Sequence, residues 1–291
     1  MARARDWLDL IRAPAAFTVL GDTLVGAVAA GRGAQPLRAA GLAGSSVLLY
    51  WAGMALNDVA DAELDAVERP ERPIPSGRIT RRGAWCAATA LTVAGVALAA
   101  RSGGRAAVAV AVPLAASIWT YDLVAKDTRL GPVVMSACRG LDVLLGAGAD
   151  RADRALGPAA ALTLHTASVT ALSRGEVHGS TSAAAAGSLA LTGVVTASAV
   201  ASAGSPLDVG LAAAASARYV ARVGGAQARA VGDPSAAQVR TATRAGILGM
   251  IPLQAALLAG RGAHVLAGAL VGLDLVLTRR RARAARGGDI T

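Results

Sequence analysis

The 291-residue sequence has few charged residues, few aromatic residues and only two cysteines. Charged side chains make up 16% of the chain, whereas typical soluble domains contain about 25%. Hydrophobic residues make up 54% of it, so a soluble, alanine-rich helical protein would have too little polar surface to cover its apolar runs. The scarcity of charge therefore excludes an ordinary soluble domain and predicts an integral membrane protein.

The scarcity of cysteine and of aromatic residues argues against a protein held by disulfides or a cysteine metal site and against a nucleic-acid-binding protein. Cys86 and Cys138 lie in apolar segments far apart in the sequence, so we expect buried thiols rather than a disulfide or a metal-binding pair. The net charge is +10, but the basic residues lie in loops between apolar runs, with no aromatic residues interleaved. This pattern argues against nucleic acid as a partner and favours contact with anionic membrane lipid.

Apolar stretches close to the length that crosses a bilayer, about 17–25 residues, recur along the whole chain. They lie at 14–31, 38–56, 84–100, 106–121, 131–149, 156–172, 183–203, 207–223, 245–260 and 262–278. Ten spans with residue 1 in the cytoplasm leave most basic residues on the cytoplasmic side, as membrane proteins prefer. The outer loops then hold Arg32, Arg38, Arg101, Arg105, Arg151, Arg154 and Arg261. Nine spans, with 245–278 forming one kinked helix, are the alternative.

The composition of these stretches favours a tightly packed bundle in a single domain. They are rich in Ala, Gly, Ser and Val, and small residues let helices approach closely in lipid. We expect one all-helical transmembrane domain over 1–291, with a basic cytoplasmic tail at 279–291 and a central cavity open to lipid. No cleavable signal peptide is evident, because the first apolar run already has the length of a span.

Acidic residues with helical spacing close the second apolar stretch. Asn57, Asp61 and Asp65 are four residues apart, so on a helix they lie along one side, and Asp58 lies next to them. Oxygen ligands in such a row suit Mg²⁺, which takes one or two protein carboxylates and leaves other positions for water and phosphate. Carboxylates at the end of a membrane span are costly unless they are used. The row therefore predicts a site for a lipid-tailed phosphate.

Cationic side chains follow the acidic row. Arg69 and Arg72 lie in the proline-rich loop that continues to Arg78, and guanidinium groups match phosphate oxygens. The alternative is a salt-bridged loop in which Arg69 and Arg72 only pair with Asp65 and Glu68. Both interpretations remain open from the sequence.

A second cluster of polar residues surrounds Lys126, the only lysine in the chain. Lys126 ends a Tyr-x-x-x-x-Lys sequence that begins at Tyr121. Arg139 and Asp142 follow on one helix face and either pair with each other or contribute to a phosphate site. Arg12, at the start of the first span, is a further cationic candidate.

Together these motifs resemble the UbiA superfamily of intramembrane prenyltransferases over roughly residues 8–260. The resemblance rests on Asn-Asp-x-x-Asp-x-x-x-Asp at 57–65, Arg-Pro-x-x-Ser-Gly at 72–77 and Tyr-x-x-x-x-Lys at 121–126. It implies a helical bundle in which two acidic motifs hold Mg²⁺ against an isoprenyl diphosphate. The metal ligands it implies are Asn57, Asp58, Asp61, Asp65 and Glu176. The diphosphate-binding residues it implies are Arg12, Arg69, Arg72, Lys126, Arg139, Ser173 and Arg174. Of these two sets, it implies that Asp61, Asp65, Glu176 and Lys126 are catalytic.

The second acidic motif departs from the family pattern. Family members carry Asp-x-x-x-Asp after the sixth span, whereas this chain has Leu172 four residues before Glu176. Ser173, Arg174 or His178 would then complete the pocket through hydrogen bonds to phosphate. The resemblance is therefore to a divergent branch, with one metal ion or with a second held mainly by diphosphate oxygens.

The sequence predicts Mg²⁺-dependent transfer of an isoprenyl group to a small acceptor with an aromatic or hydroxylated ring, at the cytoplasmic face of a bacterial plasma membrane. A terpene cyclase of the same superfamily is an alternative, but it would line its cavity with aromatic rings, and aromatic residues make up only 3% of this chain. A transporter would need ionisable groups along a path through the midplane, and most of those here gather at one face. A non-catalytic membrane binding or scaffold protein is the third alternative.

Overall fold

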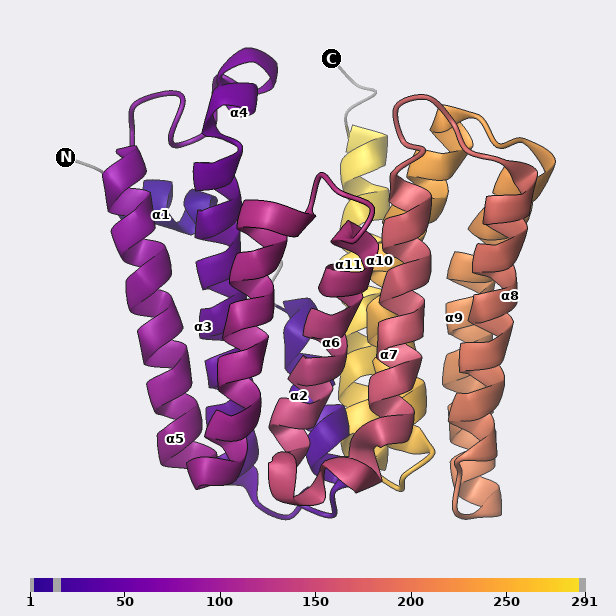
Figure 1. The fold of residues 1–291 in the computed structure, drawn as a ribbon. Helices are drawn as coiled ribbons and strands as arrows, with labels where there is room; N and C mark the ends of the chain where they lie inside the picture. The colour runs from indigo at the N-terminus through magenta and orange to yellow at the C-terminus, as the bar shows by residue number, and fades with distance from the viewer. Residues whose placement is uncertain (1–2, 13–16, 288–291) are drawn as a thin grey trace. The chain divides into compact units, whose positions relative to one another are not determined.

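The computed structural model describes residues 3–12 and 17–287, and these residues form helices and connecting turns without a strand (Figure 1). The elements are α1 (Ala4–Leu10), α2 (Phe17–Ala29), α3 (Pro36–Ala60), α4 (Ala62–Glu68), α5 (Arg81–Thr120), the π-helix η2 (Tyr121–Ala125), α6 (Gly131–Ala147), the 3-10 turn η3 (Ala149–Arg151), α7 (Ala152–Ser173), α8 (Ser182–Ala201), α9 (Pro206–Gly232), α10 (Ala236–Ala259) and α11 (His264–Gly287). The all-helical prediction is confirmed.

Each apolar stretch predicted from the sequence overlaps a helix. The stretches at 84–100 and 106–121 are the two halves of α5, which meet at Gly104. Gly104 has φ 63° and ψ −155°, a conformation that a residue with a β-carbon rarely adopts. The first predicted span begins at residue 14, but residues 13–16 lie outside the described part of the chain.

Within the described residues, five helical segments are long and apolar enough to cross a membrane: 36–60, 81–125, 149–173, 182–201 and 236–259. Helix α2 is apolar but shorter. The chain is therefore an integral membrane protein, whereas the number of spans, nine or ten, and the side of the membrane that each loop faces stay predictions. The tail at 279–291 begins as the last turns of α11, with Arg279 and Arg280 exposed, and residues 288–291 lie outside the described part.

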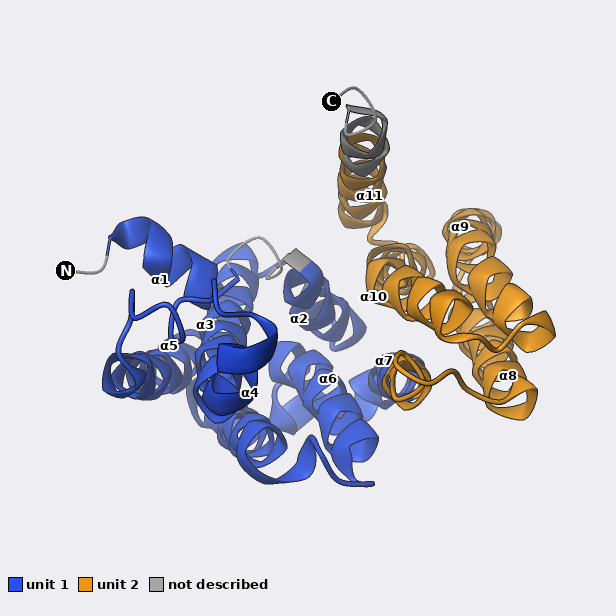
Figure 2. Ribbon diagram, turned by 90° about the horizontal axis from the view of Figure 1, so that it is seen from above, with its two compact units in different colours: residues 1–167 blue, residues 168–291 orange. Residues whose placement is uncertain are grey.

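Residues 1–167 and 168–291 form two compact units (Figure 2). The single domain expected over 1–291 stays a prediction. Unit 1 contains α1 to α6 and most of α7, and unit 2 contains the end of α7 and α8 to α11.

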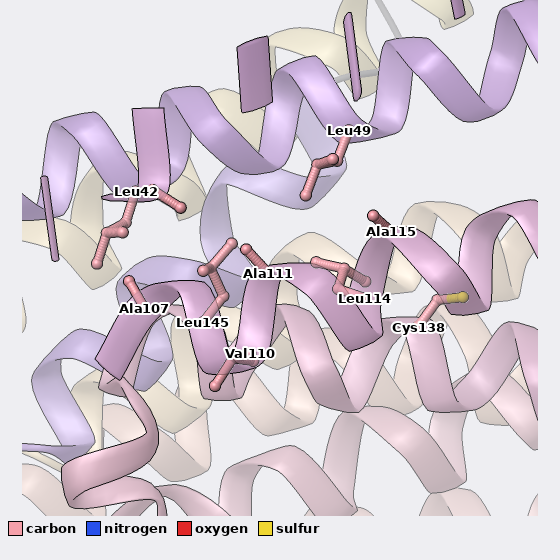
Figure 3. Packing of buried hydrophobic residues seen from close by; sticks show 10 residues of the cluster. Leu42, Leu49, Ala107, Val110, Ala111, Leu114, Ala115, Cys138 and Leu145 are labelled. Carbon is pink, nitrogen blue, oxygen red and sulfur yellow. The ribbon is translucent and has the colours of Figure 1, made fainter. Parts of the chain in front are cut away.

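The centre of unit 1 is an apolar layer between α3, α5 and α6 (Figure 3). Leu42 and Leu49 of α3 pack against Ala111 and Leu114 in the second half of α5, and Leu145 of α6 closes the cluster. All five side chains are at most 3% exposed. The small alanine side chains among the leucines let the helices approach closely. This packing fixes the orientation of α3, whose C-terminal end carries the acidic row.

A second apolar cluster holds the loop after α4 against the end of α3. Leu56 and Val59 of α3 pack with Ile79 and with Leu10 of α1. At the edge of this cluster, Asp6 Oδ1 accepts a hydrogen bond of 2.8 Å from Arg78 Nη1. The backbone N–H of Arg3 and the guanidinium of Arg78 lower the pKa of Asp6, because both stabilise its charged form. The C-terminal end of the loop at 69–80 is thus fixed by both contacts.

Helices α2 and α6 cross at two glycines with almost no space between their backbones. A β-carbon at Gly26 would lie 1.8 Å from the carbonyl oxygen of Val143, and one at Gly146 would lie 1.9 Å from that of Thr23. Real β-carbons do not approach this closely, so neither position accepts a side chain without separating the helices.

Replacing Gly26 by alanine is expected to destabilise the protein by about 3 kcal/mol, because the added methyl group would force α2 away from α6. Thermal unfolding in detergent measures this. Gly157→Ala in α7 is the matched control, since a β-carbon there has nothing within 4 Å. It should leave the melting temperature unchanged or slightly raised. Equal melting temperatures for the Gly26 and Gly157 variants would contradict the close contact between α2 and α6.

Unit 2 has its own core and its own buried ion pairs. Leu172, Ala226 and Val239 pack in an apolar cluster at the ends of α7, α9 and α10. Within the helices, Arg218 and Arg222 of α9 both pair with Asp274 of α11, which is 2% exposed.

The prediction for the cysteines is partly wrong. Both thiols are free, and Cys138 is buried as expected, but Cys86 is exposed. Cys86 is exposed on α5, and apolar composition alone does not reveal which face of a helix is buried.

Candidate functional site

The polar residues of unit 1 gather where α3 ends and α4 begins. Asp61 lies between the two helices, and its backbone angles, φ −88° and ψ 5°, depart slightly from those of a helix. The hydrogen bonds of the helical backbone nevertheless continue across it. The N–H of Asp61 donates to the carbonyl of Asn57 (2.9 Å), and the N–H of Asp65 donates to that of Asp61 (2.8 Å). The helical repeat therefore continues through residues 57–65, as the sequence spacing predicts.

Asp58 and Asp65 face a single guanidinium group. Seven residues turn a helix through about 700°, which brings the two side chains to nearly the same face. Arg72 Nη1 lies 3.4 Å from Asp58 Oδ1 and 2.5 Å from Asp65 Oδ2. The two aspartates are 3% and 2% exposed. Two buried carboxylates thus share one cation that the loop after α4 supplies.

Two further arginines extend this cluster. Arg12 Nη2 donates to Asp58 Oδ1 at 2.7 Å, and Arg69 Nη1 lies 3.9 Å from Asp65 Oδ1. Arg12 has φ 47°, in the left-handed region that residues other than glycine seldom adopt. Such strain at a polar site is retained when its contacts stabilise it, and here the contact is the charge-assisted hydrogen bond to Asp58.

Asn57 and Asp61 belong to a second, adjacent cluster. Asn57 Nδ2 donates to Asp122 Oδ1 (3.3 Å), and Lys126 forms an ion pair with Asp61. Asp122 is 4% exposed. Asp122 and Lys126 lie in and directly after η2, and such π-helical turns often occur at functional sites because they re-aim side chains.

The residues of the predicted row have different partners in the structure. Asn57, Asp61 and Asp65 were expected to act as one line of ligands, but Asp65 faces Arg72 together with Asp58, whereas Asn57 and Asp61 face Asp122 and Lys126. Asp122 was missed as a site residue. The pairing of Asp58 with Asp65 had a signal in the sequence, since a spacing of seven keeps residues on one helix face better than a spacing of four.

Of the two alternatives for Arg139 and Asp142, the structure does not show a pairing with each other. Arg139 Nη1 lies 2.8 Å from Oδ2 of Asp22 on α2, and Asp142 Oδ2 accepts a hydrogen bond of 2.8 Å from Ser46 on α3. Arg139 and Asp142 therefore connect α6 to two different helices. The role of Arg139 in binding diphosphate stays a prediction.

The second predicted motif lies in unit 2, at the end of α7. The hydroxyl of Ser173 donates to the carbonyl of Thr170 (2.9 Å), and the backbone carbonyl of Glu176 accepts from Arg240 (2.6 Å). Leu172 is buried, whereas Arg174 and His178 are exposed. The roles predicted for Ser173, Arg174 and Glu176 stay predictions.

The carboxylates of unit 1 offer a divalent cation two ligands rather than a complete set. In the described chain, no three His, Cys, Asp or Glu side chains are arranged as a metal-binding group. Asp58 and Asp65 nevertheless direct one oxygen each at the same cationic nitrogen of Arg72. Mg²⁺ is commonly held by one or two carboxylates together with water and substrate phosphate, so this donor pair fits it.

The family model described as the UbiA prenyltransferase family matches residues 19–174 of this chain. Among curated proteins, the chain is similar to the digeranylgeranylglyceryl phosphate synthase of Natronomonas pharaonis, with 38% identity over 98 residues, which is 34% of this chain and 35% of that protein. The enzyme of the same name from Methanothrix thermoacetophila is 44% identical over 94 residues, or 32% of this chain and 35% of that protein. The chain thus spans about a third of the length of these relatives.

Two solved structures resemble most of the chain more closely in fold than in sequence. One is described as a digeranylgeranylglyceryl phosphate synthase in membranes, with a TM-score of 0.64 and 17% identity over 88% of this chain and 98% of that chain. The other is a UbiA homolog from Aeropyrum pernix, with a TM-score of 0.63 and 20% identity over 89% of this chain and 98% of that chain. At these identities the likeness concerns the fold alone.

Proposed function

Because the chain belongs to the UbiA prenyltransferase family, we propose that it transfers an isoprenyl group from an isoprenyl diphosphate to an acceptor within the membrane. The pair of buried aspartates, Asp58 and Asp65, carries this proposal. Both are at most 3% exposed and both face Arg72. Buried carboxylates at the end of a membrane helix are expensive, and a site that binds a charged headgroup gives them a use.

The proposal assigns the residues of unit 1 by charge. Asp58 and Asp65 would hold Mg²⁺ between their carboxylates, whose negative charge Arg72 neutralises in this structure. When bound, Mg²⁺ supplies positive charge that stabilises the leaving diphosphate. Arg12, Arg69, Arg72 and Lys126 would donate hydrogen bonds to diphosphate oxygens, which suits guanidinium and ammonium groups.

The reaction forms one bond and breaks another. A nucleophilic atom of the acceptor bonds to the first carbon of the isoprenyl chain, the bond from that carbon to the diphosphate oxygen breaks, and diphosphate leaves with the electron pair. Lys126 and Arg72 would stabilise the growing negative charge on the diphosphate. A hydroxyl acceptor gives up its proton in the same process, and an oxygen of the released diphosphate would accept it. Apolar side chains along the helices would keep water from the electron-poor carbon.

The names of the relatives suggest an acceptor other than the predicted ring. Digeranylgeranylglyceryl phosphate, the product in those names, contains a glyceryl phosphate. We therefore propose that the acceptor is a hydroxyl of a glyceryl phosphate lipid and that the donor carries a geranylgeranyl chain. The aromatic or hydroxylated ring expected from the sequence is not confirmed and serves as the comparison in the test.

An assay of the purified protein in detergent tests this proposal. Geranyl, farnesyl and geranylgeranyl diphosphates are supplied with Mg²⁺ and with geranylgeranylglyceryl phosphate, with an aromatic hydroxy acid or with no acceptor. We expect one diphosphate released per prenylated glyceryl phosphate lipid, fastest with the geranylgeranyl donor.

The other outcomes separate the alternatives. Transfer to the aromatic acid alone would support prenyl transfer and refute the lipid acceptor. Diphosphate release together with a hydrocarbon product in the absence of acceptor would indicate a cyclase. No turnover of any donor would refute prenyl transfer with these substrates and favour a non-catalytic membrane protein.

A further inference from the structure

Four arginines gather at the end of unit 1 opposite the aspartates. Arg32 lies in the loop between α2 and α3, Arg38 in the first turn of α3, and Arg151 and Arg154 at η3 and the start of α7. These connections lie at the same end of the unit, and α4 lies at the other end (Figure 1). The sequence topology assigns all four to the side of the membrane that usually carries fewer basic residues.

Three of the four bind the ends of helices. Arg151 Nη1 donates to the carbonyl of Ala30 after α2 (2.9 Å), and Arg32 donates to the carbonyl of Ala147 at the end of α6. Arg38 Nη1 lies 3.5 Å from the carbonyl of Ser102, near the turn in α5. The C-terminal end of a helix carries partial negative charge, which attracts cations. These bonds account for one donor on each arginine.

Two glycines lie next to the guanidinium groups, and at Gly148 a side chain would displace them. A β-carbon at Gly148 would lie 2.7 Å from Arg32 Nη1 and 3.1 Å from Arg38 Nη2. A β-carbon at Gly31 would lie 3.7 Å from Arg151 Nη1 and 3.8 Å from that of Arg154. Gly148 and Gly31 also have φ of 79° and 69°. The four guanidinium groups therefore lie around two glycines, Gly31 and Gly148, which have no side chain to occupy this space.

The positive charge of this cluster is not balanced by the protein. Asp150 pairs with Arg32, and the neighbouring Asp153 is exposed, so within the described residues three of the four arginines have no carboxylate partner. Within the described residues, Nε and Nη2 of Arg38 are buried and have no hydrogen-bond partner. Buried donors without a partner are costly, and this cost is avoided if an acceptor binds there.

We propose that Arg32, Arg38, Arg151 and Arg154 form a binding site for a phosphate group at the membrane interface opposite the aspartate site. Phosphate suits this position because it accepts several charge-assisted hydrogen bonds at once and removes the excess positive charge. The group is supplied either by the headgroup of an anionic lipid or by free phosphate. This site is independent of the proposed transfer reaction, since it shares no residue with it.

The alternative is that these arginines only cap helices. Arg154 distinguishes the two explanations, because within the described residues it makes no hydrogen bond and its loss removes no cap. Arg154→Gln therefore should fold normally but bind phosphate less well. Arg38→Gln removes the buried donors and serves as a second variant. Arg82→Gln is the matched control, an exposed arginine at the other end of unit 1.

Thermal unfolding of the full chain in detergent tests the site with three additions. Dioleoylphosphatidylglycerol supplies a lipid phosphate, dioleoylglycerol supplies the same chains without phosphate, and inorganic phosphate supplies the free anion. We expect phosphatidylglycerol to raise the melting temperature of the wild type and of Arg82→Gln. The apparent affinity should be about tenfold weaker in Arg154→Gln and in Arg38→Gln, since each loses a charge-assisted contact.

The additions identify the source of the phosphate. An Arg154-dependent shift with phosphatidylglycerol but not with inorganic phosphate supports a lipid headgroup, and the same shift with inorganic phosphate alone supports a free anion. The proposal is overturned if phosphatidylglycerol stabilises Arg154→Gln as strongly as it does the wild type, or if dioleoylglycerol produces the same stabilisation. Either result would leave helix capping as the role of the cluster.

Discussion

Asp65→Asn is expected to lower kcat by about a hundredfold or more, because it removes one of two carboxylates proposed to hold the metal and diphosphate. Asparagine has the same shape, and Arg72 keeps Asp58 as a partner at 3.4 Å, so the protein should remain folded. Asp58→Asn should cause a loss of similar size, because Asp58 supplies the second carboxylate. Turnover assays with the donor and acceptor proposed above provide the measurement.

Glu63→Gln is the control for this experiment. Glu63 lies on α4 between Asp61 and Asp65, but its side chain is 93% exposed. Its replacement should leave kcat within about twofold of the wild type, as expected for a surface residue distant from reacting groups. Full activity in Asp65→Asn, or a loss in Asp65→Asn that only tracks unfolding, would contradict the assignment of the site.

Arg72→Gln is expected to destabilise the protein by about 3 kcal/mol or more, because it leaves two buried carboxylates without their shared cation. The Arg72 side chain is only 18% exposed, and the side chains alone of Asp58 and Asp65 are 4% and 2% exposed, so solvent would screen the remaining charges weakly. Unfolding by denaturing detergent measures the change. Millimolar Mg²⁺ should restore part of the lost stability, since a divalent cation fits between the two carboxylates.

Arg69→Gln provides the comparison. Arg69 also approaches Asp65, but at 3.9 Å and with a side chain that is 53% exposed. Exposed pairs of this kind contribute about 0–1 kcal/mol, so this variant should unfold close to the wild type and should gain little from Mg²⁺. The account of Arg72 is wrong if the two variants are equally stable, or if Mg²⁺ stabilises both to the same extent.

The positions of the helices could be predicted from the sequence because they depend on local properties. Long apolar runs define the spans, and residues with clear backbone preferences end them. Thr80 accepts a hydrogen bond from the N–H of Gly83 at the start of α5, and Gly104 allows the turn in the middle of that helix. The acidic row at 57–65 could be found for the same reason, since it lies within one helical stretch.

The partners of the acidic residues could not be predicted, because they come from other elements. Arg72 lies in the loop after α4, which returns to the end of α3 where Ile79 packs against Leu56 and Val59, and this return brings Arg72 to Asp58 and Asp65. Arg139 has Asp142 on the next turn of its own helix but pairs with Asp22 of α2, since the close crossing of α2 and α6 brings that carboxylate nearer. Local spacing indicates which residues share a face but does not identify what lies opposite that face.

The central claim is that Asp58 and Asp65 bind an isoprenyl diphosphate through a divalent cation. Calorimetric titration of the purified protein with a non-hydrolysable geranylgeranyl diphosphate analogue, with Mg²⁺ and with EDTA, tests it without requiring turnover. The account predicts binding with Mg²⁺ that is lost with EDTA and lost in the double variant Asp58→Asn/Asp65→Asn, while Glu63→Gln binds normally. Equal binding with and without Mg²⁺, or unchanged binding by the double variant, would contradict it.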